Sequence, residues 1–218
     1  MSSNTKNNQL LSRLWSTFSK QHTLTQLQED QFKKYLALLQ EWAELINITT
    51  IIDSADIIAY HFNDSLAVKN VVDLSSFKGI MDIGSGGGFP GIPLKIMYPE
   101  LPIYLLEVNG KKISFLRTVI EQLGLEKIEL CTLDWRTFIK KTDYEIDLFL
   151  SRASLHTDEL ARLFGHVSNY RNAQLIYWAS NQWQPTPKDM PYLVKEEAYI
   201  INHKKRRFIF FSLPHTTI

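Results

Sequence analysis

The sequence predicts an α/β fold in which a mostly parallel sheet follows a helical N-terminal extension. Three observations predict it: apolar side chains recur at helical spacing over residues 1–75, short apolar runs alternate with helical stretches from residue 79 onward, and a glycine-rich turn joins the first such run to a helix. Strands buried on both faces read as continuous apolar runs, and helices between them imply parallel crossovers. We expect an extension over 1–75 and one compact sheet domain over 76–218.

The extension is expected to hold several helices. After Thr25, apolar side chains recur at Phe32, Leu36, Leu39, Ala43 and Ile46. The segment NITT at 47–50 ends this helix with residues that prefer caps and turns. A shorter helix follows near 54–60, and another is expected to begin in HFNDSLAV at 61–68.

Short apolar runs mark the strands. Five of them are expected to be parallel, at 80–83, 103–107, 128–131, 146–150 and 175–178, with helical stretches at 111–123 and 158–167 among the connections. The tail offers two more strands, near 192–200 and 208–213. The polar segment INHKKRR between these two predicts an antiparallel hairpin.

The composition narrows the class of protein. The 218 residues are 44% hydrophobic and 22% charged, with a formal net charge of +1. The net charge therefore does not indicate a nucleic-acid partner, although a local basic surface is still possible. A single cysteine, Cys131, allows no disulfide framework and fits a reducing compartment. The first residues lack a signal-peptide pattern, and no apolar run is long enough to span a bilayer. We expect a cytoplasmic protein with no membrane partner, no obligate protein partner and no metal.

The stretch IMDIGSGGGFPGIPL at 80–94 carries most of the functional argument. Its first glycines are Gly84, Gly86, Gly87 and Gly88. They follow a strand directly, and glycine lets the backbone come close to a small ligand and point N–H groups at it. A nucleotide-containing ligand is therefore expected at this turn.

Two nucleotide cofactors compete for the glycine turn. A G-x-G-x-x-G pattern ending at Gly91 would suit a dinucleotide, but Pro90 and Pro93 stand where the helix begins and remove N–H donors that a pyrophosphate needs. The rival is S-adenosylmethionine, which carries no phosphate. Its ammonium could face Asp82, and its carboxylate could accept hydrogen bonds from glycine N–H groups.

Glu107 ends the second strand, about 20 residues beyond the glycines, where a carboxylate accepts hydrogen bonds from ribose hydroxyls. Ligands of such sheets lie beyond the carboxyl ends of the strands. The alternative is a polar residue that merely marks where a strand emerges. The glycine turn just before it favours the ribose role.

Four segments resemble, in the same order, those of the bacterial small-subunit ribosomal RNA guanine-N7 methyltransferases, also called the glucose-inhibited division protein B family. The most specific is DIGSGGGFPGIPLKI at 82–96. The others are NITTIIDSADIIAYHFNDSLAV at 47–68, LLEVNGKKISFLRTVIEQLGLEKIEL at 105–130 and LSRASL at 150–155. The similarity covers roughly residues 30–155.

The resemblance implies a Rossmann-like methyltransferase domain with a helical extension, S-adenosylmethionine as methyl donor, and N7 of one guanosine in small-subunit (16S) ribosomal RNA as acceptor. It puts donor contacts on Gly84 and Phe89. The family's residue pair after the third strand falls on Trp135 and Arg136, and its arginine after the fourth strand falls on Arg152. Combined with the residue-level argument, the expected donor-binding set is Asp82, Gly84, Gly86, Gly88, Phe89, Glu107, Trp135, Arg136 and Arg152.

The chain also departs from the family pattern. LDWRTF at 133–138 replaces the usual R-A-E-E-like string. The segment 169–189 has neither the family's glycine-rich turn nor its lysine–glycine pair. An alternative function is therefore a non-catalytic S-adenosylmethionine-binding protein, or a methyltransferase for another RNA or a small molecule.

Methyl transfer to guanine N7 requires little acid–base chemistry, because N7 offers a lone pair and carries no proton. The enzyme chiefly supplies proximity and orientation. A carboxylate near the charge that develops on the purine could help, and Asp64 and Asp134 are candidates. Arg152 is the other candidate for the reaction centre, and no acid–base pair is assigned.

RNA binding requires phosphate contacts and stacking. Candidate cations are Lys111, Lys112 and Arg117 on one helix, Lys140 and Lys141 on a loop, and Lys204, Lys205, Arg206 and Arg207 in the hairpin. A solvated face is the alternative for each. We favour Lys111 and the four hairpin residues, because adjacent positive charges repel unless something compensates them.

Two further sets of residues each have a structural and a functional interpretation. His61, Asp64 and Ser65 either seat a helix against the sheet or contact the donor or RNA. Trp178 and Trp183 either stack on a base or are buried in the last strand and its loop, and burial is favoured.

Overall fold

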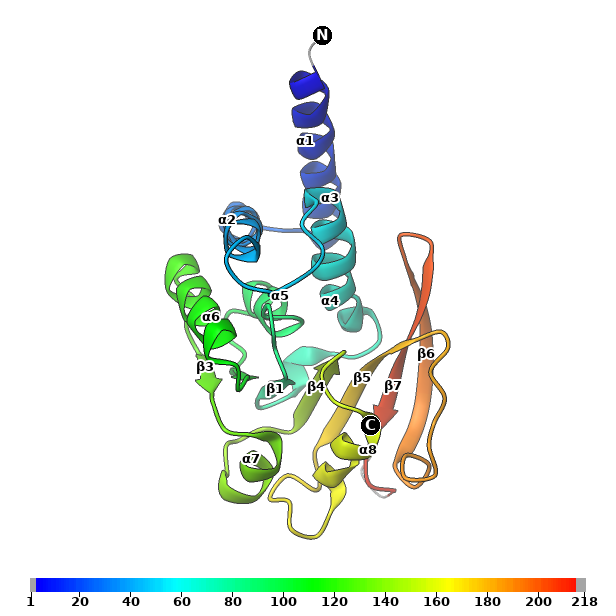
Figure 1. The fold of residues 1–218 in the computed structure, drawn as a ribbon. Helices are drawn as coiled ribbons and strands as arrows, with labels where there is room; N and C mark the ends of the chain where they lie inside the picture. Colours follow the sequence, from blue (N-terminus) through cyan, green and yellow to red (C-terminus); the bar gives the residue numbers. More distant parts are fainter. Residues whose placement is uncertain (1–2, 215–218) are drawn as a thin grey trace.

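A seven-stranded sheet runs through the centre of the protein (Figure 1). The computed structural model describes the backbone of residues 3–214 and the side chains of residues 9–214, so the outermost bounds of the two expected segments, at 1–2 and 215–218, lie outside the described residues. The strands are β1 (Ile80–Ile83), β2 (Ile103–Leu106), β3 (Ile128–Cys131), β4 (Leu148–Arg152), β5 (Gln174–Ser180), β6 (Leu193–Ile201) and β7 (Lys204–Phe211).

The strand order is β3-β2-β1-β4-β5-β7-β6. Strands β1 to β5 pair in parallel, whereas β7 is antiparallel to both β5 and β6. The α/β class, the mostly parallel sheet and the C-terminal antiparallel hairpin are thus confirmed. Because the chain leaves β1 toward β2 on one side and later returns at β4 on the other, the carboxyl ends of β1 and β4 form the switch point of the sheet.

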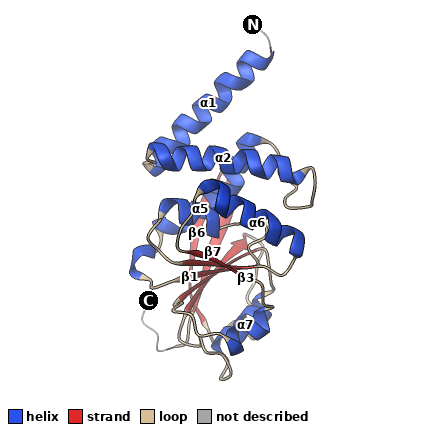
Figure 2. Ribbon diagram, turned by 90° about the vertical axis from the view of Figure 1, so that its left-hand side faces the viewer, coloured by secondary structure: helices blue, strands red, loops and turns tan. Residues whose placement is uncertain are grey.

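Helices cover both faces of this sheet. They are α1 (Ser3–His22), α2 (Gln26–Ala43), α3 (Ser54–Ile57), η1 (Ile58–Asn63), α4 (Asp64–Leu66), η2 (Ala67–Asn70), η3 (Leu74–Ser76), α5 (Gly91–Met97), α6 (Gly110–Leu123), α7 (Trp135–Lys141), α8 (Thr157–Leu160) and η4 (Ala161–Phe164). Figure 2 shows the sheet edge-on, with α2, α5 and α6 on one side and α7 on the other.

Side chains that alternate along the strands divide the core in two. Ile80 and Ile103 face the layer that includes α5, α6 and the N-terminal helices, whereas Met81 and Phe149 face α7, α8 and η4. Phe32 of α2 belongs to the same apolar cluster as these first strand residues. The division at residue 75 stays a prediction, but the extension packs directly on the sheet layer.

Helix α2 follows the predicted pattern closely. Thr25 caps it, and the side chain of Gln28 returns the hydrogen bond in a capping box. Its buried side chains are Phe32, Tyr35, Leu36 and Leu39. The helix ends at Ala43, so Ile46 lies beyond it.

The two helices expected over 54–68 are one continuous run. Asp53 caps α3, which passes through the π-helix η1 into α4 and η2. No glycine or proline stands between Ser54 and Asn70 to interrupt it. The separate start predicted at HFNDSLAV was therefore wrong.

The hairpin turn is much shorter than predicted. It consists of Asn202 and His203, which have φ values of +43° and +69°, the conformation of a tight two-residue hairpin turn. Residues 204–207 consequently lie within β7 and not in a polar connection. Lys204 and Lys205 extend past the end of β5, which pairs with β7 only as far as Arg206, so both side chains stay exposed.

Three smaller boundaries also differ from the prediction. Lys140 and Lys141 occupy the last turn of α7 and not a loop. The helix expected over 158–167 is a short α-helix followed by a 3-10 turn that stops before Gly165. Strand β4 runs on to include Arg152. Over residues 3–214, no helix combines the length and the apolar character needed to cross a membrane.

Candidate functional site

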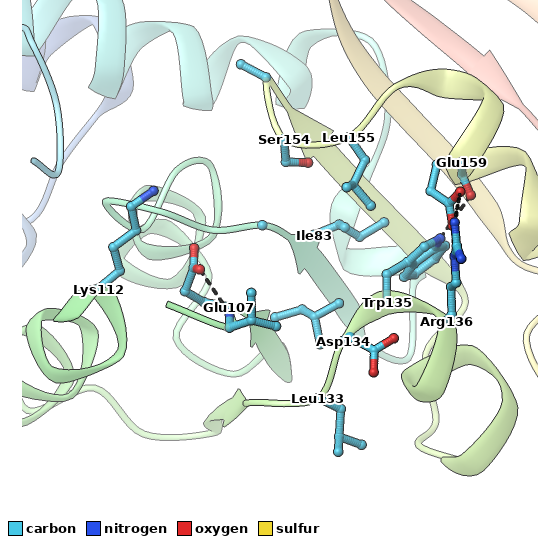
Figure 3. A pocket seen from close by; sticks show the side chains of 14 residues that line it. Ile83, Glu107, Lys112, Leu133, Asp134, Trp135, Arg136, Ser154, Leu155 and Glu159 are labelled. Atoms are coloured by element: carbon cyan, nitrogen blue, oxygen red, sulfur yellow. Dashed lines mark hydrogen bonds and ion pairs between the residues drawn. The ribbon is translucent and has the colours of Figure 1, made fainter. Parts of the chain in front are cut away.

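A cavity of about 660 Å³ opens at the carboxyl ends of the central strands (Figure 3). Its lining residues come from the ends of β1, β2 and β4, from α6 and α7, and from α8: Ile83, Gly84, Leu106, Glu107, Val108, Lys112, Leu133, Asp134, Trp135, Arg136, Ala153, Ser154, Leu155 and Glu159. This is the switch point of the sheet, where such folds bind their ligands. Of the nine predicted donor-binding residues, four line it: Gly84, Glu107, Trp135 and Arg136.

Gly84 begins the turn after β1 and has a φ of +68°, which disfavours any residue with a Cβ. Its N–H donates to the carbonyl of Leu106 at 2.8 Å, which pins the turn to the end of β2. A Cβ added here would lie 2.4 Å from the Cβ of Ser154. The segment after β4 therefore packs directly against this glycine, and both conformation and space require glycine.

Glu107 is buried at the edge of the cavity and is held by backbone N–H groups. Its Oε1 accepts hydrogen bonds from the N–H groups of Val108 and Asn109, both at 2.9 Å, and its Oε2 accepts one from Gly86 at 2.9 Å. Each carboxylate oxygen has two lone pairs. Three of the four are thus used, and Oε2 keeps one acceptor position for a further donor such as a ribose hydroxyl.

Two exposed apolar side chains flank the same cavity. Val108 is 62% exposed and Leu133 is 40% exposed, although both are large and apolar. Neither residue was predicted from the sequence, and neither were Ser154 and the cavity-facing position of Lys112. Val108 and Leu133 lie two residues beyond the ends of β2 and β3, and that position was the available signal, because residues there project over the sheet edge.

Trp135 and Arg136 lie where α7 meets α8. The indole N–H of Trp135 donates to the carbonyl of Glu159 at 3.0 Å, and Arg136 makes a two-pronged contact with the Glu159 carboxylate at 2.7 and 3.0 Å (Figure 3). Asp134 caps α7 through Thr137. The segment LDWRTF, which departs from the family pattern, is therefore held to α8 through Glu159, and these contacts form one wall of the cavity.

Asp82 is fully buried and is absent from the cavity lining. Its Oδ2 accepts a hydrogen bond from the N–H of Gly91 at 2.9 Å, at the start of α5. Burial raises the pKa of this carboxyl to about 7, and the Gly91 hydrogen bond offsets only part of that rise. Its Oδ1 is buried and has no hydrogen-bond partner in the part of the chain that the structure describes.

Phe89 packs among aromatic rings and does not line the cavity. It stacks on His61 with ring centroids 4.3 Å apart, and Tyr35 lies 5.5 Å away. The Tyr35 hydroxyl donates to the carbonyl of Gly87. A Cβ added at Gly88, whose φ is +91°, would lie 2.7 Å from that hydroxyl. The second half of the glycine turn is thus anchored on the helical extension.

Arg152 and Asp64, two of the three candidates for the reaction centre, form an ion pair with Nη1 and Oδ2 3.0 Å apart. The Tyr199 hydroxyl donates to Asp64 Oδ1 at 2.7 Å, and Arg206 Nε lies 3.6 Å from the same oxygen. Neither of these two lines the cavity, whereas the third candidate, Asp134, does. The pair instead joins α4, β4 and the hairpin.

His61 completes this network as a neutral ring. Arg152 Nη2 donates to its Nδ1 at 3.1 Å, so Nε2 carries the hydrogen and donates to Thr49 Oγ1 at 2.8 Å. Burial, and then the Arg152 charge, lower the pKa of His61 to about 3. The hydroxyl of Ser65 donates to the carbonyl of His61 at 2.6 Å.

The hairpin cations differ in their surroundings. Lys204 Nζ lies 4.1 Å from the ring centre of Tyr60, and Lys205 is exposed. Arg206 approaches Asp64, and Arg207 contacts the carboxylate of Glu196 at 2.7 Å and the carbonyl of Trp183.

Lys111 is exposed at the start of α6. Trp178 is buried, and its indole N–H donates to the carbonyl of Asp64 at 3.0 Å. The burial predicted for this tryptophan is thus the arrangement found.

Comparison with solved structures supports the fold. A mutant of MtNAS in complex with S-adenosylmethionine matches with a TM-score of 0.57 at 18% identity, covering 94% of this chain and 78% of that chain. A human methyltransferase 10 domain containing protein matches with a TM-score of 0.52 at 14% identity, covering 70% of this chain and 80% of the other. At these identities the likeness concerns the fold alone.

Sequence comparison identifies the relatives. The ribosomal RNA small subunit methyltransferase G of Streptococcus gordonii is 36% identical over 144 residues, 64% of this chain and 60% of that protein, and its namesake from Halalkalibacterium halodurans is 38% identical over 143 residues, 65% and 60%. The chain thus spans about three fifths of the length of these two relatives. The namesake from Lachnoclostridium phytofermentans is 37% identical over 196 residues, 88% of this chain and 78% of that protein.

A family model described as rRNA small subunit methyltransferase G matches residues 28–210. The match runs from α2 to β7 and includes the glycine turn, Glu107, the segment after β4 and the hairpin. It confirms the resemblance that the four sequence segments indicated. The chain belongs to the rRNA small subunit methyltransferase G family.

Proposed function

We propose that the protein is an S-adenosylmethionine-dependent methyltransferase that methylates N7 of a guanosine in small-subunit ribosomal RNA. The observation that carries the proposal is the cavity at the switch point, with the Glu107 carboxylate at its edge, in a chain of this family. A ribosomal RNA substrate, free or in a ribosomal particle, also implies action in the cytoplasm.

The cavity fits the three parts of S-adenosylmethionine. Val108 and Leu133 offer apolar contacts for the two faces of the adenine ring. The remaining acceptor position of Glu107 Oε2 suits a ribose hydroxyl. The turn from Gly84 to Gly86 offers backbone for the methionine end: Gly84 lines the cavity, and a Cβ at Gly86 would meet only the Gly84 carbonyl oxygen at 3.8 Å.

When bound, this cofactor would supply a methyl group from a positively charged sulfur to guanine N7, and the sulfur would keep the electrons of the broken S–CH3 bond in neutral S-adenosylhomocysteine. The acceptor has no proton to lose, so no residue needs to serve as a general base. The chain's contribution is to orient the two reactants and to exclude water from between them. Ser154 and Leu155, in the segment after β4, form the wall of the cavity next to Gly84.

In this proposal Arg152 and Asp64 are positioning residues and not catalytic ones. Their charges compensate each other, and their side chains are only 13% and 1% exposed. Together with Tyr199 they connect the hairpin to the end of β4. A buried, compensated pair contributes geometry rather than charge to a reaction.

For RNA we propose phosphate contacts by Lys111, Lys204 and Lys205. Lys204 and Lys205 lie beside the hairpin turn, and no carboxylate within 4.0 Å neutralises any of the three in the described part of the chain. Arg206 and Arg207 belong to the expected RNA-binding set, but their contacts with Asp64 and Glu196 give them a role in holding the hairpin.

The test is methyl transfer from radiolabelled S-adenosylmethionine to small ribosomal subunits and to deproteinised RNA, followed by cleavage specific for N7-methylguanosine. Wild-type protein is compared with Glu107→Gln, and Glu126→Gln serves as the control because Glu126 is an exposed carboxylate remote from the cavity lining. We expect N7-specific product with wild type and with the control. Donor binding without transfer to either RNA form would instead favour another acceptor or a binding protein.

A further inference from the structure

We propose that the exposed face of α1 is a second RNA-binding surface, which contacts the phosphate backbone away from the cavity. The proposal rests on the proposed function, since it takes the same RNA as partner. We call this surface the donor face, because its side chains carry hydrogen-bond donors; the name does not refer to the methyl donor. Its residues are Gln9, Ser12, Arg13, Ser16, Thr17 and Lys20.

The donor face has a uniform chemistry. Its residues follow one another at intervals of three and one, which aligns them in a single stripe along the helix. All are exposed, and all except Thr17, whose hydroxyl donates to the Arg13 carbonyl at 2.9 Å, carry an N–H or O–H group that can donate to an anionic oxygen. No Asp or Glu precedes Glu29 in the chain, so nothing on α1 opposes a negatively charged partner.

Helix α2 illustrates what an ordinary solvated face looks like in this protein. Its exposed positions include Asp30, Lys34 and Glu41, and its Lys33 pairs with Glu29 at 2.6 Å. Mixed charges of this kind support a helix through pairs one turn apart. The donor face has no such pairs, so helix stability does not account for its composition.

The opposite face of α1 fixes the helix to the body of the protein. Phe18 lies 5.0 Å from Phe32 and 6.1 Å from Phe62 between ring centres, and His22 Nε2 is 2.6 Å from Asn63 Oδ1. From this anchored end the helix projects beyond the sheet and its covering helices (Figures 1 and 2). The donor face thus lies on a helix that is fixed at one end and projects from the body of the protein.

A groove of about 630 Å³ lies beside the donor face, between α1 and α2. Ser12, Ser16 and Lys20 of the donor face line it, and Lys33 faces them from α2. Glu29 also lies in the groove, but its charge is compensated by Lys33, whose hydrogen bond lowers the Glu29 pKa. The groove therefore brings Ser12, Ser16 and Lys20 together beside an ion pair with no net charge.

Charge complementarity identifies the partner as RNA backbone. Arg13 and Lys20 are two helical turns apart, about 10 Å along the axis, so they can reach different phosphates while the hydroxyls between them contact the same strand. A contact between two copies of this chain would need a larger apolar area than the one exposed leucine beside this face, Leu10 at 57% exposure, provides.

The experiment measures binding of a small-subunit RNA fragment as a function of salt for wild type and the double variant Arg13→Gln, Lys20→Gln. Loss of two phosphate contacts should lower the magnitude of the slope of log K against log salt by about 1.8 on duplex RNA, with weaker binding at low salt. The control is Lys78→Gln, Arg171→Gln, which removes the same charges at exposed positions near the amino ends of the strands. Circular dichroism checks that both variants fold.

A slope and affinity equal to those of wild type in the α1 variant would overturn the proposal. So would a change in sedimentation from dimer to monomer with unchanged RNA binding, which would make the face a contact between copies. S-adenosylmethionine binding, followed by calorimetry, should be unchanged in the α1 variant. If wild type binds no S-adenosylmethionine while RNA binding still depends on Arg13 and Lys20, the proposed function fails and the RNA surface stands.

Discussion

Arg152 and Asp64 neutralise each other across 3.0 Å, although each was a candidate for the reaction centre when only the sequence was considered. Asp64 lies on the helical run of the extension, and Arg152 lies at the end of β4. Arg152 also sits 5.0 Å from the ring centre of Phe89 and donates to the carbonyl of Tyr60 at 3.0 Å. The pair thereby ties the glycine turn to the extension.

Asp64→Asn should destabilise the protein by about 3–5 kcal/mol, because it leaves the buried Arg152 without its counter-charge. Tyr199→Phe removes one hydrogen bond to the same carboxylate and should cost about 1.5–3 kcal/mol. Urea unfolding measures both changes. An Asp64→Asn protein that keeps wild-type stability but transfers no methyl group would contradict the positioning role and restore Asp64 as a catalytic residue.

Much of the fold was predictable because the strands are short, mainly apolar runs. The run at 80–83 matches β1, whose four residues are all buried, and the run at 128–131 matches the edge strand β3, in which Glu129 is exposed. The hairpin was placed with less success, because Lys204 to Arg207 look like a solvated connection when their partners are unknown. Only pairing with β6 across a two-residue turn places them in a strand.

The site was predictable where backbone geometry decides the residue type, and less so where side chains choose their partners. Gly84 and Glu107 line the cavity because strand ends converge at the switch point. Sequence spacing could not reveal that Arg152 turns toward Asp64, or that Glu159 reaches back to Arg136 from another helix. Such long-range pairs depend on how helices pack, which periodicity does not encode.

Gly84→Ala should abolish S-adenosylmethionine binding and destabilise the protein, because its Cβ would lie 2.4 Å from Ser154 in addition to the positive φ. Gly124→Ala is the matched control. Gly124 also has a positive φ, of +59°, but no atom lies within 4 Å of its added Cβ. This variant therefore isolates the effect of backbone strain. Calorimetry with S-adenosylmethionine separates the two, and equal affinities in both variants would contradict the close packing of the turn.

Glu107→Gln should weaken S-adenosylmethionine binding about 10- to 100-fold, the effect of losing a charge-assisted hydrogen bond to the ribose. The amide also turns one of two acceptor atoms into a donor that faces the N–H groups of Gly86 or Val108. Calorimetry measures the affinity, with Glu126→Gln as control. Sinefungin, which keeps the ribose, should lose as much affinity as the cofactor, and an unchanged affinity would remove Glu107 from the site.

Asp82 should make the protein less stable as pH rises from about 4 to about 7. Burial raises its pKa to about 7 from an ordinary value of 3.8, so in this window the folded protein holds a proton that the unfolded chain has released. The free energy of unfolding then falls with pH until Asp82 ionises in the folded state. Above pH 7 this contribution is complete and no longer changes.

The titration of His61 changes the free energy of unfolding in the opposite direction over much of the same pH window. The measurement must therefore separate the contributions of the two groups. Its pKa is lowered to about 3, so below pH 6.5 the unfolded chain binds the proton and stability rises with pH. Urea unfolding of wild type and Asp82→Asn at several pH values from 4.5 to 8 cancels the His61 contribution in the difference. The stability of Asp82→Asn relative to wild type should grow with pH and level off near pH 7, and a difference independent of pH would show that Asp82 does not titrate with a raised pKa.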